Sequence, residues 1–294
     1  MRLFLALSAC LLSMPAQAAV SVTDDDGATV TLQHPARRVV SLAPHVTEML
    51  FAAGGGDRIV GTVKYSDYPP AARDIPRVGD NRMVDIERLV SLKPDLLVVW
   101  RHNASSRQME QLRKLGIPLY YSEPHKLDDV PESILRLGQL MGTTQEAQRS
   151  AAHLRQQLDS LNARYRHRPL VRVFYQVWDK PLYTLNDRHI ISDAIRLCGG
   201  ENIFARLPQI STSLSPEAVL QENPEAIVSG DRRDQATSGI EIWKQYPTML
   251  AVKRGNLFAL DADLVNRSGP RIVEGAAELC EKLEQARKRR GDRS

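Results

Sequence analysis

The chain has 294 residues, enough for two hydrophobic cores, and its 43% hydrophobic and 25% charged residues are ordinary for a globular protein. The net charge is a modest +4, and no basic stripe interleaved with aromatic residues runs through the sequence, so nucleic-acid binding is excluded from the expected functions. Much of the basic excess lies in residues 287–294, which we interpret as a frayed, solvated terminus.

The first 18 residues are typical of a secretory signal peptide. Arg2 precedes a mostly apolar run, and Ala16-Gln17-Ala18 is an A-x-A cleavage pattern. A lipoprotein signal at Cys10 is the alternative, but the apolar run before that cysteine is very short. No later segment reaches the roughly 18 consecutive apolar residues of a membrane span. We therefore expect an exported, soluble protein, tethered at most by a lipid.

Removal of the signal peptide leaves two cysteines, Cys198 and Cys280. A pair of cysteines in an oxidising compartment indicates one disulfide, and two buried free thiols are the alternative.

The first part of the mature chain alternates strands with helices. A hairpin is expected over residues 20–32, turning at Asp25-Asp26-Gly27. Further strands are expected at Val39–Leu42, Ile59–Thr62, Leu96–Trp100 and Pro118–Tyr121, and helices at about 47–53, after Asp85, and at about 105–115. This rhythm of strand and helix predicts a mostly parallel sheet.

A segment of the chain occurs twice. Residues 85–99 read DIERLVSLKPDLLVV, and residues 215–229 read SPEAVLQENPEAIVS. Each opens with a helix-capping residue, Asp85 or Ser215, places a glutamate two positions later, and breaks at a proline before an apolar strand. The glutamates are Glu87 and Glu217, and the offset is constant at 130 residues. Repetition at this period indicates two similar α/β lobes, and a cleft between two lobes is a place for a ligand.

The stretch 128–167 shows no strand signal. Leucines at 154, 158 and 161 and Tyr165 follow at helical spacing, so we expect one helix over about 144–166, roughly 33 Å long. Two shorter helices inside a single domain are the alternative, but strand and helix alternation restarts just after this stretch. Expected in the second lobe are strand Val171–Val177, helix Ile190–Leu197, strand Leu257–Leu260 and helix Pro270–Arg287. We therefore predict a signal peptide (1–18), an N-terminal lobe (19–125), bridging helices (126–167), a C-terminal lobe (168–290) and a basic tail end (291–294).

Several segments together carry a resemblance to a known family. They are RVVSLAPHVTEMLFAAG (38–54), YSDYPP (65–70), DIERLVSLKPDLLVVWR (85–101), LCGGENIF (197–204) and SGPRIVEGAAELC (268–280). These segments resemble the periplasmic substrate-binding proteins of ABC importers for cobalamin, haem and ferric siderophores, and most of all the cobalamin-binding branch. The likeness covers nearly all of the mature chain.

The resemblance implies a fold and a role. The fold is two Rossmann-like α/β lobes with mostly parallel sheets, bridged by one long helix, with little hinge motion. The role is that of a periplasmic, monomeric binding protein without a cofactor of its own, which carries cobalamin or a related corrinoid to a membrane importer with a cytoplasmic ATPase. The family docks through one acid on each lobe, and these acids map onto Glu87 and Glu217. Arginines on the permease are their natural partners, although an acid in a first helical turn also suits the helix dipole.

The cleft contacts of the cobalamin-binding branch map onto five residues, namely Tyr65, Trp100, Tyr183, Asp263 and Arg267. Aromatic rings suit the apolar faces of a corrinoid disc, and Asp and Arg reach its amide rim. At two further positions, where that branch has cleft tryptophans, this chain has Asn81 and Ser211. The loss of stacking surface suggests weaker binding, a different corrinoid or another ligand.

Three histidines each follow an expected strand of the first lobe: His45, His102 and His125. Ligands of parallel α/β sheets gather at those strand ends, so one histidine is a candidate axial ligand of cobalt or haem iron. Solvated loop histidines are the common alternative.

Three other functions remain as alternatives. A haem or ferric-siderophore binding protein would keep the class and change the ligand. A zinc-binding protein of the same superfamily would need three or four converging His, Asp or Glu ligands. An exported enzyme is not expected, because the sequence has no Gly-x-Ser-x-Gly elbow, no HExxH and no paired-carboxylate motif at the strand ends.

Overall fold

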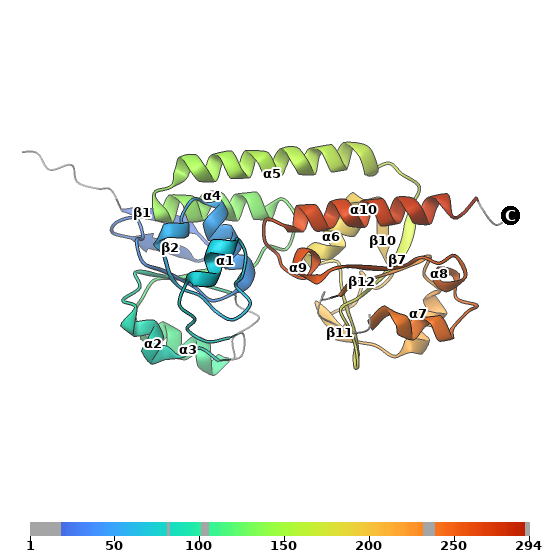
Figure 1. Ribbon diagram of the computed structural model, residues 1–294, viewed down its shortest axis with the longest axis horizontal. Helices are drawn as coiled ribbons and strands as arrows, with labels where there is room; N and C mark the ends of the chain where they lie inside the picture. Colours follow the sequence, from blue (N-terminus) through green and yellow to red (C-terminus); the bar gives the residue numbers. More distant parts are fainter. Residues whose placement is uncertain (1–18, 81–82, 101–105, 232–238, 292–294) are drawn as a thin grey trace, which may run out of the picture.

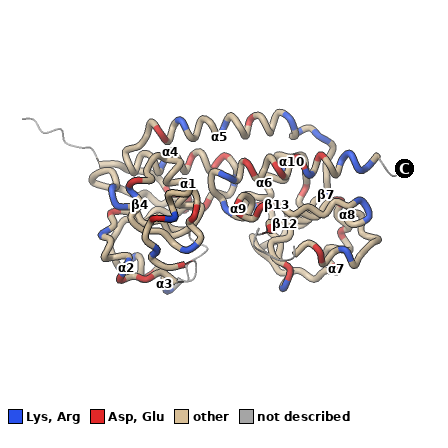
Figure 2. The backbone as a smooth tube through the Cα atoms, viewed as in Figure 1, with Lys and Arg blue, Asp and Glu red and all other residues tan. Residues whose placement is uncertain are grey.

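The structure is a computed structural model that describes residues 19–80, 83–100, 106–231 and 239–291. Two α/β lobes lie side by side, and helix α5 (Thr144–Tyr165) runs along the back of both (Figure 1). Charges of both signs are interspersed over the two lobes (Figure 2). None of the described helices is both long and apolar enough to span a membrane.

The N-terminal lobe is built on a four-stranded parallel sheet in the order β4-β3-β5-β6. Its strands are β3 (Val39–Ser41), β4 (Ile59–Gly61), β5 (Leu96–Val99) and β6 (Leu119–Tyr121). Its helices are α1 (Pro44–Ala52), α2 (Ile86–Ser91) and α3 (Ser106–Lys114). The predicted hairpin is present as antiparallel β1 (Val20–Thr23) and β2 (Thr29–Leu32). Helix α1 begins three residues before the predicted start because Pro44, whose fixed φ suits a first helical position, opens it.

The C-terminal lobe repeats this plan with a parallel sheet in the order β10-β7-β12-β13. Its strands are β7 (Val171–Gln176), β10 (Gly200–Asn202), β12 (Ala226–Asp231) and β13 (Leu257–Asp261). Its helices are α6 (Ile190–Leu197), α7 (Pro216–Glu222), α8 (Leu250–Lys253), α9 (Ala262–Val265) and α10 (Ile272–Lys288). The parallel sheets of both lobes confirm the predicted fold class.

A second, antiparallel sheet in this lobe was not predicted. It has the order β11-β9-β8 and consists of β8 (Trp178–Asp179), β9 (Leu182–Leu185) and β11 (Ser211–Ser213). The strands are only two to four residues long, too short to show the alternating apolar pattern that marks a strand in a sequence.

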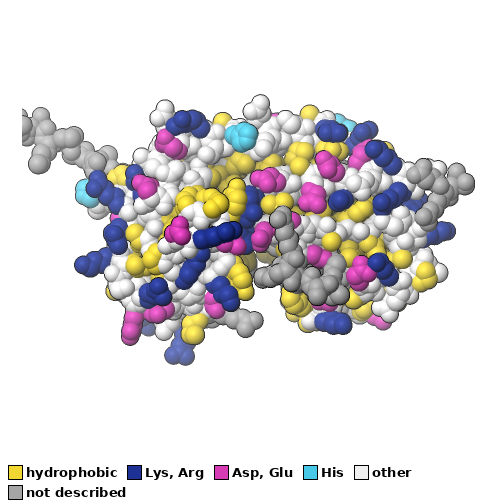
Figure 3. Space-filling view, in the orientation of Figure 1, with side chains coloured by type: hydrophobic (Ala, Val, Ile, Leu, Met, Phe, Trp, Pro, Cys, Tyr) yellow, Lys and Arg dark blue, Asp and Glu magenta, His cyan; other side chains and the backbone are white. Residues whose placement is uncertain are grey.

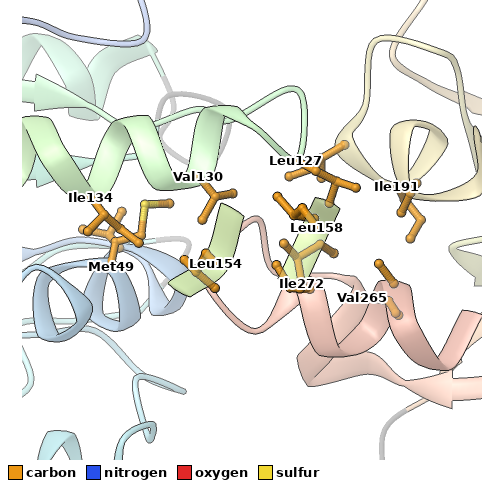
Figure 4. Packing of buried hydrophobic residues seen from close by; sticks show 14 of the residues in the cluster. Met49, Leu127, Val130, Ile134, Leu154, Leu158, Ile191, Val265 and Ile272 are labelled. Carbon is orange, nitrogen blue, oxygen red and sulfur yellow. The ribbon is translucent and has the colours of Figure 1, made fainter. Parts of the chain in front are cut away.

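Helix α5 links the cores of the two lobes, as predicted. It packs along α4 (Asp129–Met141) and also contacts α1 in one lobe and α6 and α10 in the other. Figure 4 shows Leu154 of α5 beside Met49, while Leu158 lies one turn further along, near Ile272. The buried residues of both lobes form one continuous cluster through this helix.

The two copies of the repeated segment form α2 followed by β5 and α7 followed by β12. Asp85 caps α2, with its carboxylate accepting a hydrogen bond from the Arg88 backbone N–H at 3.0 Å. Ser215 occupies the N-cap position of α7, as predicted, but its side chain makes no capping hydrogen bond. Instead, Pro216 opens that helix, and the Ser215 hydroxyl bonds the carboxylate of Glu217.

The predicted disulfide joins Cys198 to Cys280, which tethers the end of α6 to α10. The prediction of a frayed, solvated C-terminus is wrong for residues 287–290. The Arg287 guanidinium is buried and donates to the carbonyl oxygens of Cys198 and Gly199 at 2.7 and 3.0 Å. Arg290 forms a two-pronged pair with Glu225 at 2.6 Å for each oxygen. Basic residues at a helix C-terminus satisfy carbonyl groups, and here they anchor the chain end.

Candidate ligand-binding cleft

A cavity of about 1040 Å³ lies between the two lobes. Ligand pockets in proteins measure roughly 300–1,000 Å³, so this one is suited to a large ligand. The N-terminal lobe contributes Trp100, Glu123, Pro124 and His125 to its wall. The C-terminal lobe contributes most of the remainder, including Gln176–Asp179, Arg188, Gln209–Ser211, Ser229–Asp231, Asn266 and Ser268.

The wall is assembled at the carboxyl ends of the parallel strands. Trp100 follows β5, and Glu123 follows β6. Trp178 follows β7, and Asp231 ends β12. In open α/β sheets, ligands bind in the crevice outside the carboxyl ends of the strands. Two such ends face each other across this cavity.

Two tryptophans stand in the wall, one from each lobe. Trp100 is half-buried, and its ring meets the buried His45 ring edge to face at a centroid distance of 5.5 Å. Trp178 is 53% exposed, although its indole N–H donates to the Lys180 carbonyl at 3.0 Å. An aromatic ring so exposed offers a flat apolar face that a ligand can cover. Trp178 was not predicted, because the resemblance that assigned Trp100 to the cleft does not map a contact onto it, although both tryptophans come just after a buried parallel strand.

The charged groups of the wall are mostly acidic. Among the described lining residues stand three carboxylates and one guanidinium: Glu123, Asp179, Asp231 and Arg188. Asp231 is held by the Ser229 hydroxyl, which donates to it at 2.8 Å. Arg188 donates to the Pro208 carbonyl and remains exposed. Such a wall offers acceptors to N–H donors of a ligand and repels a strongly anionic one.

The structure places the predicted ligand contacts in different surroundings. Trp100 lines the cavity, whereas the other four are absent from its described lining. Arg267 lies between two lining residues, but its guanidinium pairs with Glu48, Asp67 and Asp263 at 3.1, 3.2 and 2.8 Å.

Of the two predicted tyrosines, Tyr65 lies in the loop after β4 and Tyr183 lies in strand β9. Tyr65 adopts a left-handed φ of 69° and is 43% exposed, with the Lys64 ammonium 5.1 Å from its ring centre. Tyr183 is half-buried in β9, opposite Trp178 in the antiparallel sheet. Ser211 is exposed and lines the cavity, whereas Asn81 lies outside the described residues.

Of the three candidate histidines, His125 is exposed and lines the cavity. His45 lies behind Trp100, where its Nε2 finds no hydrogen-bond partner. Burial, assisted by the charge of Arg267, lowers the pKa of His45 to about 4 despite a hydrogen bond to the Ser122 backbone. His102 lies outside the described residues. Over the part of the chain that the structure describes, no three His, Cys, Asp or Glu side chains are grouped to hold a metal ion.

Comparison with known proteins identifies the class. Residues 39–264 match the family of periplasmic binding proteins. The vitamin B12-binding protein of Vibrio cholerae (strain El Tor Inaba N16961) is 36% identical over 255 residues, which are 86% of this chain and 91% of that protein. The vitamin B12-binding protein of Yersinia pestis (strain Pestoides F) is 34% identical over 273 residues, 93% and 89% of the two chains. The chain belongs to the periplasmic binding protein family.

Solved structures agree with this membership. The crystal structure of the periplasmic vitamin B12 binding protein of V. cholerae matches with a TM-score of 0.80 at 36% identity, over 86% of this chain and 99% of that one. The periplasmic heme-binding protein RhuT of Roseiflexus sp. RS-1 matches with a TM-score of 0.73 at 24% identity, over 85% and 98%. The second likeness shows the shared fold alone.

In this binding protein the two predicted docking acids are exposed on equivalent helices. Glu87 is in the first turn of α2, and Glu217 is in the first turn of α7. Both helices lie on the side of their lobe away from α5 (Figure 1). Hydrogen bonds from its own backbone N–H and from the Ser215 hydroxyl lower the pKa of Glu217. Glu217 is therefore ionised at neutral pH.

Proposed function

We propose that this protein captures cobalamin or a related corrinoid in the inter-lobe cavity and delivers it to a membrane ABC importer. The observation that carries the proposal is the wall of the cavity. It joins an aromatic face from each lobe, Trp100 and Trp178, to a rim dominated by carboxylates. A corrinoid presents apolar faces to such rings and neutral amides to such acceptors. The relatives at 36% and 34% identity, which are vitamin B12-binding proteins, support the same ligand.

The proposal includes export of the protein to the periplasm. Residues 1–18 act as a cleaved signal peptide, and the mature chain is a periplasmic monomer without catalytic activity. Anchoring by a lipid at Cys10 is the alternative. Mass spectrometry of the exported protein separates the two, since cleavage after Ala18 yields a chain that begins at Ala19 and carries no acyl group.

Titration of the purified protein with cyanocobalamin tests the ligand. Heat release or a change in the corrin absorption should saturate at one ligand per chain. Aquocobalamin tests axial ligation separately, because His125 could replace its bound water and shift the corrin spectrum, a shift that His125→Ala would abolish. Absence of binding at high micromolar cyanocobalamin would overturn the proposal.

Haem is the second candidate ligand, and one observation favours it. The exposed imidazole of His125 stands in the cavity wall, where it could ligate iron. Against haem stands the charge of the wall, because its three carboxylates would face the carboxylates of a porphyrin. A Soret band that appears on addition of hemin and disappears in His125→Ala would establish haem instead. A ferric siderophore with a net negative charge would meet the same repulsion.

The exposed acids Glu87 and Glu217 are proposed to dock onto arginines of the permease. The double variant Glu87→Ala/Glu217→Ala should keep the affinity for cyanocobalamin and lose most of the uptake in vesicles that contain the cognate importer. A matched control removes two exposed acids elsewhere on the lobes, Glu110 and Glu241, which are 64% and 49% exposed. Normal uptake by the docking double variant would show that these glutamates serve their helices only.

A further inference from the structure

The two lobes are joined by a buried group of charges as well as by α5. Its centre is Glu48 on α1, whose side chain is only 2% exposed. The carboxylate accepts hydrogen bonds from Arg271 Nε at 3.0 Å and Arg271 Nη2 at 2.6 Å, each on its own oxygen. Arg267 Nη1 donates a third bond at 3.1 Å. A carboxylate of the N-terminal lobe is thus held by two arginines of the other lobe.

A loop of the N-terminal lobe joins the same arginines. Arg267 Nη1 lies 3.2 Å from the Asp67 carboxylate, and the Arg271 guanidinium lies 4.0 Å from the centre of the Tyr68 ring. Each arginine therefore contacts both α1 and the loop after β4. Figure 3 shows basic and acidic side chains next to one another along the seam between the lobes.

The backbone between the two arginines is seated directly on α1. A Cβ atom added at Gly269 would lie 3.3 Å from His45 Cβ and 3.4 Å from Glu48 Oε2. These distances are tighter than most Cβ contacts, so a side chain at this position would press the lobes apart. Glycine allows the C-terminal lobe to approach α1 closely.

These contacts lie immediately behind the cavity wall. Asn266 and Ser268, the neighbours of Arg267, line the cavity from one lobe. Trp100 lines it from the other and packs on His45, one turn of α1 before Glu48. A change in the distance between Glu48 and the arginines would therefore move both walls of the cavity.

A buried carboxylate is tolerated only while its partners stay in place. Rotation of the lobes away from each other would separate Glu48 from both arginines at once and leave its buried carboxylate without a partner, while Arg267 would keep its pair with Asp263 of its own lobe. The closed arrangement of charges therefore opposes opening, and it does so before any ligand arrives.

We propose that Glu48, Arg267 and Arg271 form an inter-lobe clasp that fixes the separation of the lobes in the ligand-free protein and so sets the width of the cavity. These are positioning residues, which act on the ligand through the walls that they hold. A binding site that is already in its bound shape loses no affinity to rearrangement. If only a fraction of the molecules has that shape, the apparent Kd is the intrinsic Kd divided by that fraction.

The test compares Glu48→Gln with Glu225→Gln. Glu225 is the matched control, because it is also a buried glutamate that pairs with two arginines, Arg254 and Arg290, but all three lie in the C-terminal lobe. Spin labels at Ser91→Cys on α2 and Gln221→Cys on α7 report the distance between the lobes by pulsed electron resonance. Both positions are exposed and lie far from α5.

Without ligand, the parent protein and Glu225→Gln should give the same narrow distance distribution. Glu48→Gln should give a broader distribution shifted to longer distances, and cyanocobalamin should restore the narrow one. If the competent arrangement falls to about a tenth of the molecules, the Kd for cyanocobalamin rises about ten-fold. A folded Glu48→Gln protein with an unchanged distance distribution would overturn the clasp.

Arg271→Lys keeps the test decisive if Glu48→Gln does not fold. Lysine retains the charge but loses the two-pronged fork on Glu48 and the stack on Tyr68, so a smaller broadening is expected. An unchanged distribution in that variant would likewise contradict the proposal. Because the distances are measured without ligand, this test of the clasp does not depend on the identity of the ligand.

Discussion

In the N-terminal copy of the repeated segment, Asp85 accepts a hydrogen bond from the Arg88 N–H, whereas in the C-terminal copy Ser215 leaves its helix uncapped and bonds Glu217. The two copies nevertheless produce the same helix and the same parallel strand. The C-terminal lobe has a disulfide and a wall tryptophan, Trp178, that is 53% exposed. The N-terminal lobe has neither among its described residues, and it buries an imidazole with an unsatisfied nitrogen. One fold is therefore stabilised by different interactions in its two halves.

Removal of the disulfide should give the largest difference between the lobes. Replacing Cys198 and Cys280 by serine releases a loop closed over 82 residues. The chain-entropy model gives a loss of about 4 kcal/mol in the free energy of unfolding. Urea unfolding followed by circular dichroism measures it, and hydrogen exchange should rise in α6 and α10 before α1 and α2. Equal loss of protection in both lobes would show that the disulfide stabilises the whole protein instead.

The buried His45 should make the N-terminal lobe sensitive to acid. Its pKa is about 4 when folded against an ordinary 6.5, so below pH 6.5 the unfolded chain binds a proton that the folded chain refuses. Stability should therefore decrease as the pH falls from about 6.5 to about 4, by about 3 kcal/mol from this residue.

The variant His45→Asn, which keeps a donor near Nδ1, should lack this part of the pH dependence. His153→Asn, on an exposed position of α5, is the control and should retain it. Unfolding by urea at several pH values measures both. Parallel pH profiles for parent and His45→Asn would refute the assignment.

The two wall tryptophans should contribute similarly to ligand affinity but differently to the free energy of unfolding. Trp178→Ala should raise the Kd for cyanocobalamin about ten-fold and leave the free energy of unfolding within about 0.5 kcal/mol, because the ring is largely exposed. Trp100→Ala should weaken binding similarly and also destabilise the lobe by about 2 kcal/mol, because its ring packs on His45 and the core. Calorimetry and urea unfolding give the two quantities. Phenylalanine at each position should recover most of the loss, and an unchanged Kd for Trp178→Ala would place that ring outside the contact.

The helix caps should give the smallest difference. Asp85→Ala removes a capping hydrogen bond and should cost about 1 kcal/mol of unfolding free energy. Ser215→Ala removes no capping bond and should cost a few tenths. Urea unfolding of both variants tests whether the loss in the free energy of unfolding depends on the capping hydrogen bond or on the residue type alone. Equal costs would mean that it does not depend on the hydrogen bond.

The sequence was sufficient for features that depend on local pattern. The parallel strands are short apolar runs, the leucines of α5 mark one buried face, and the two mature cysteines have one way to pair. These features, together with the resemblance, predicted the fold class and two candidate residues that line the cavity, Trp100 and His125.

The features that sequence reasoning missed depend on distant contacts. Glu48 and the two arginines that bind it lie 219 and 223 residues apart. No local sequence pattern near Glu48 or near the arginines indicates that they pair. An acidic residue in a helix is normally interpreted as a surface residue. The hairpin that carries Trp178 was missed for another reason, because its strands are too short to show a period.

The single crossing of the chain along α5 has a consequence for how the protein is made. Every described strand of the first parallel sheet precedes α5, and every strand of the second follows it. The N-terminal lobe is thus complete in sequence when the chain has been made as far as α5, and it can fold while the remainder is still being synthesised. The arginines that neutralise Glu48 arrive among the last 30 or so residues. Until then the first lobe carries an unpartnered acid on its inner face, and a chaperone or a protease that meets the half-emerged protein will find it there.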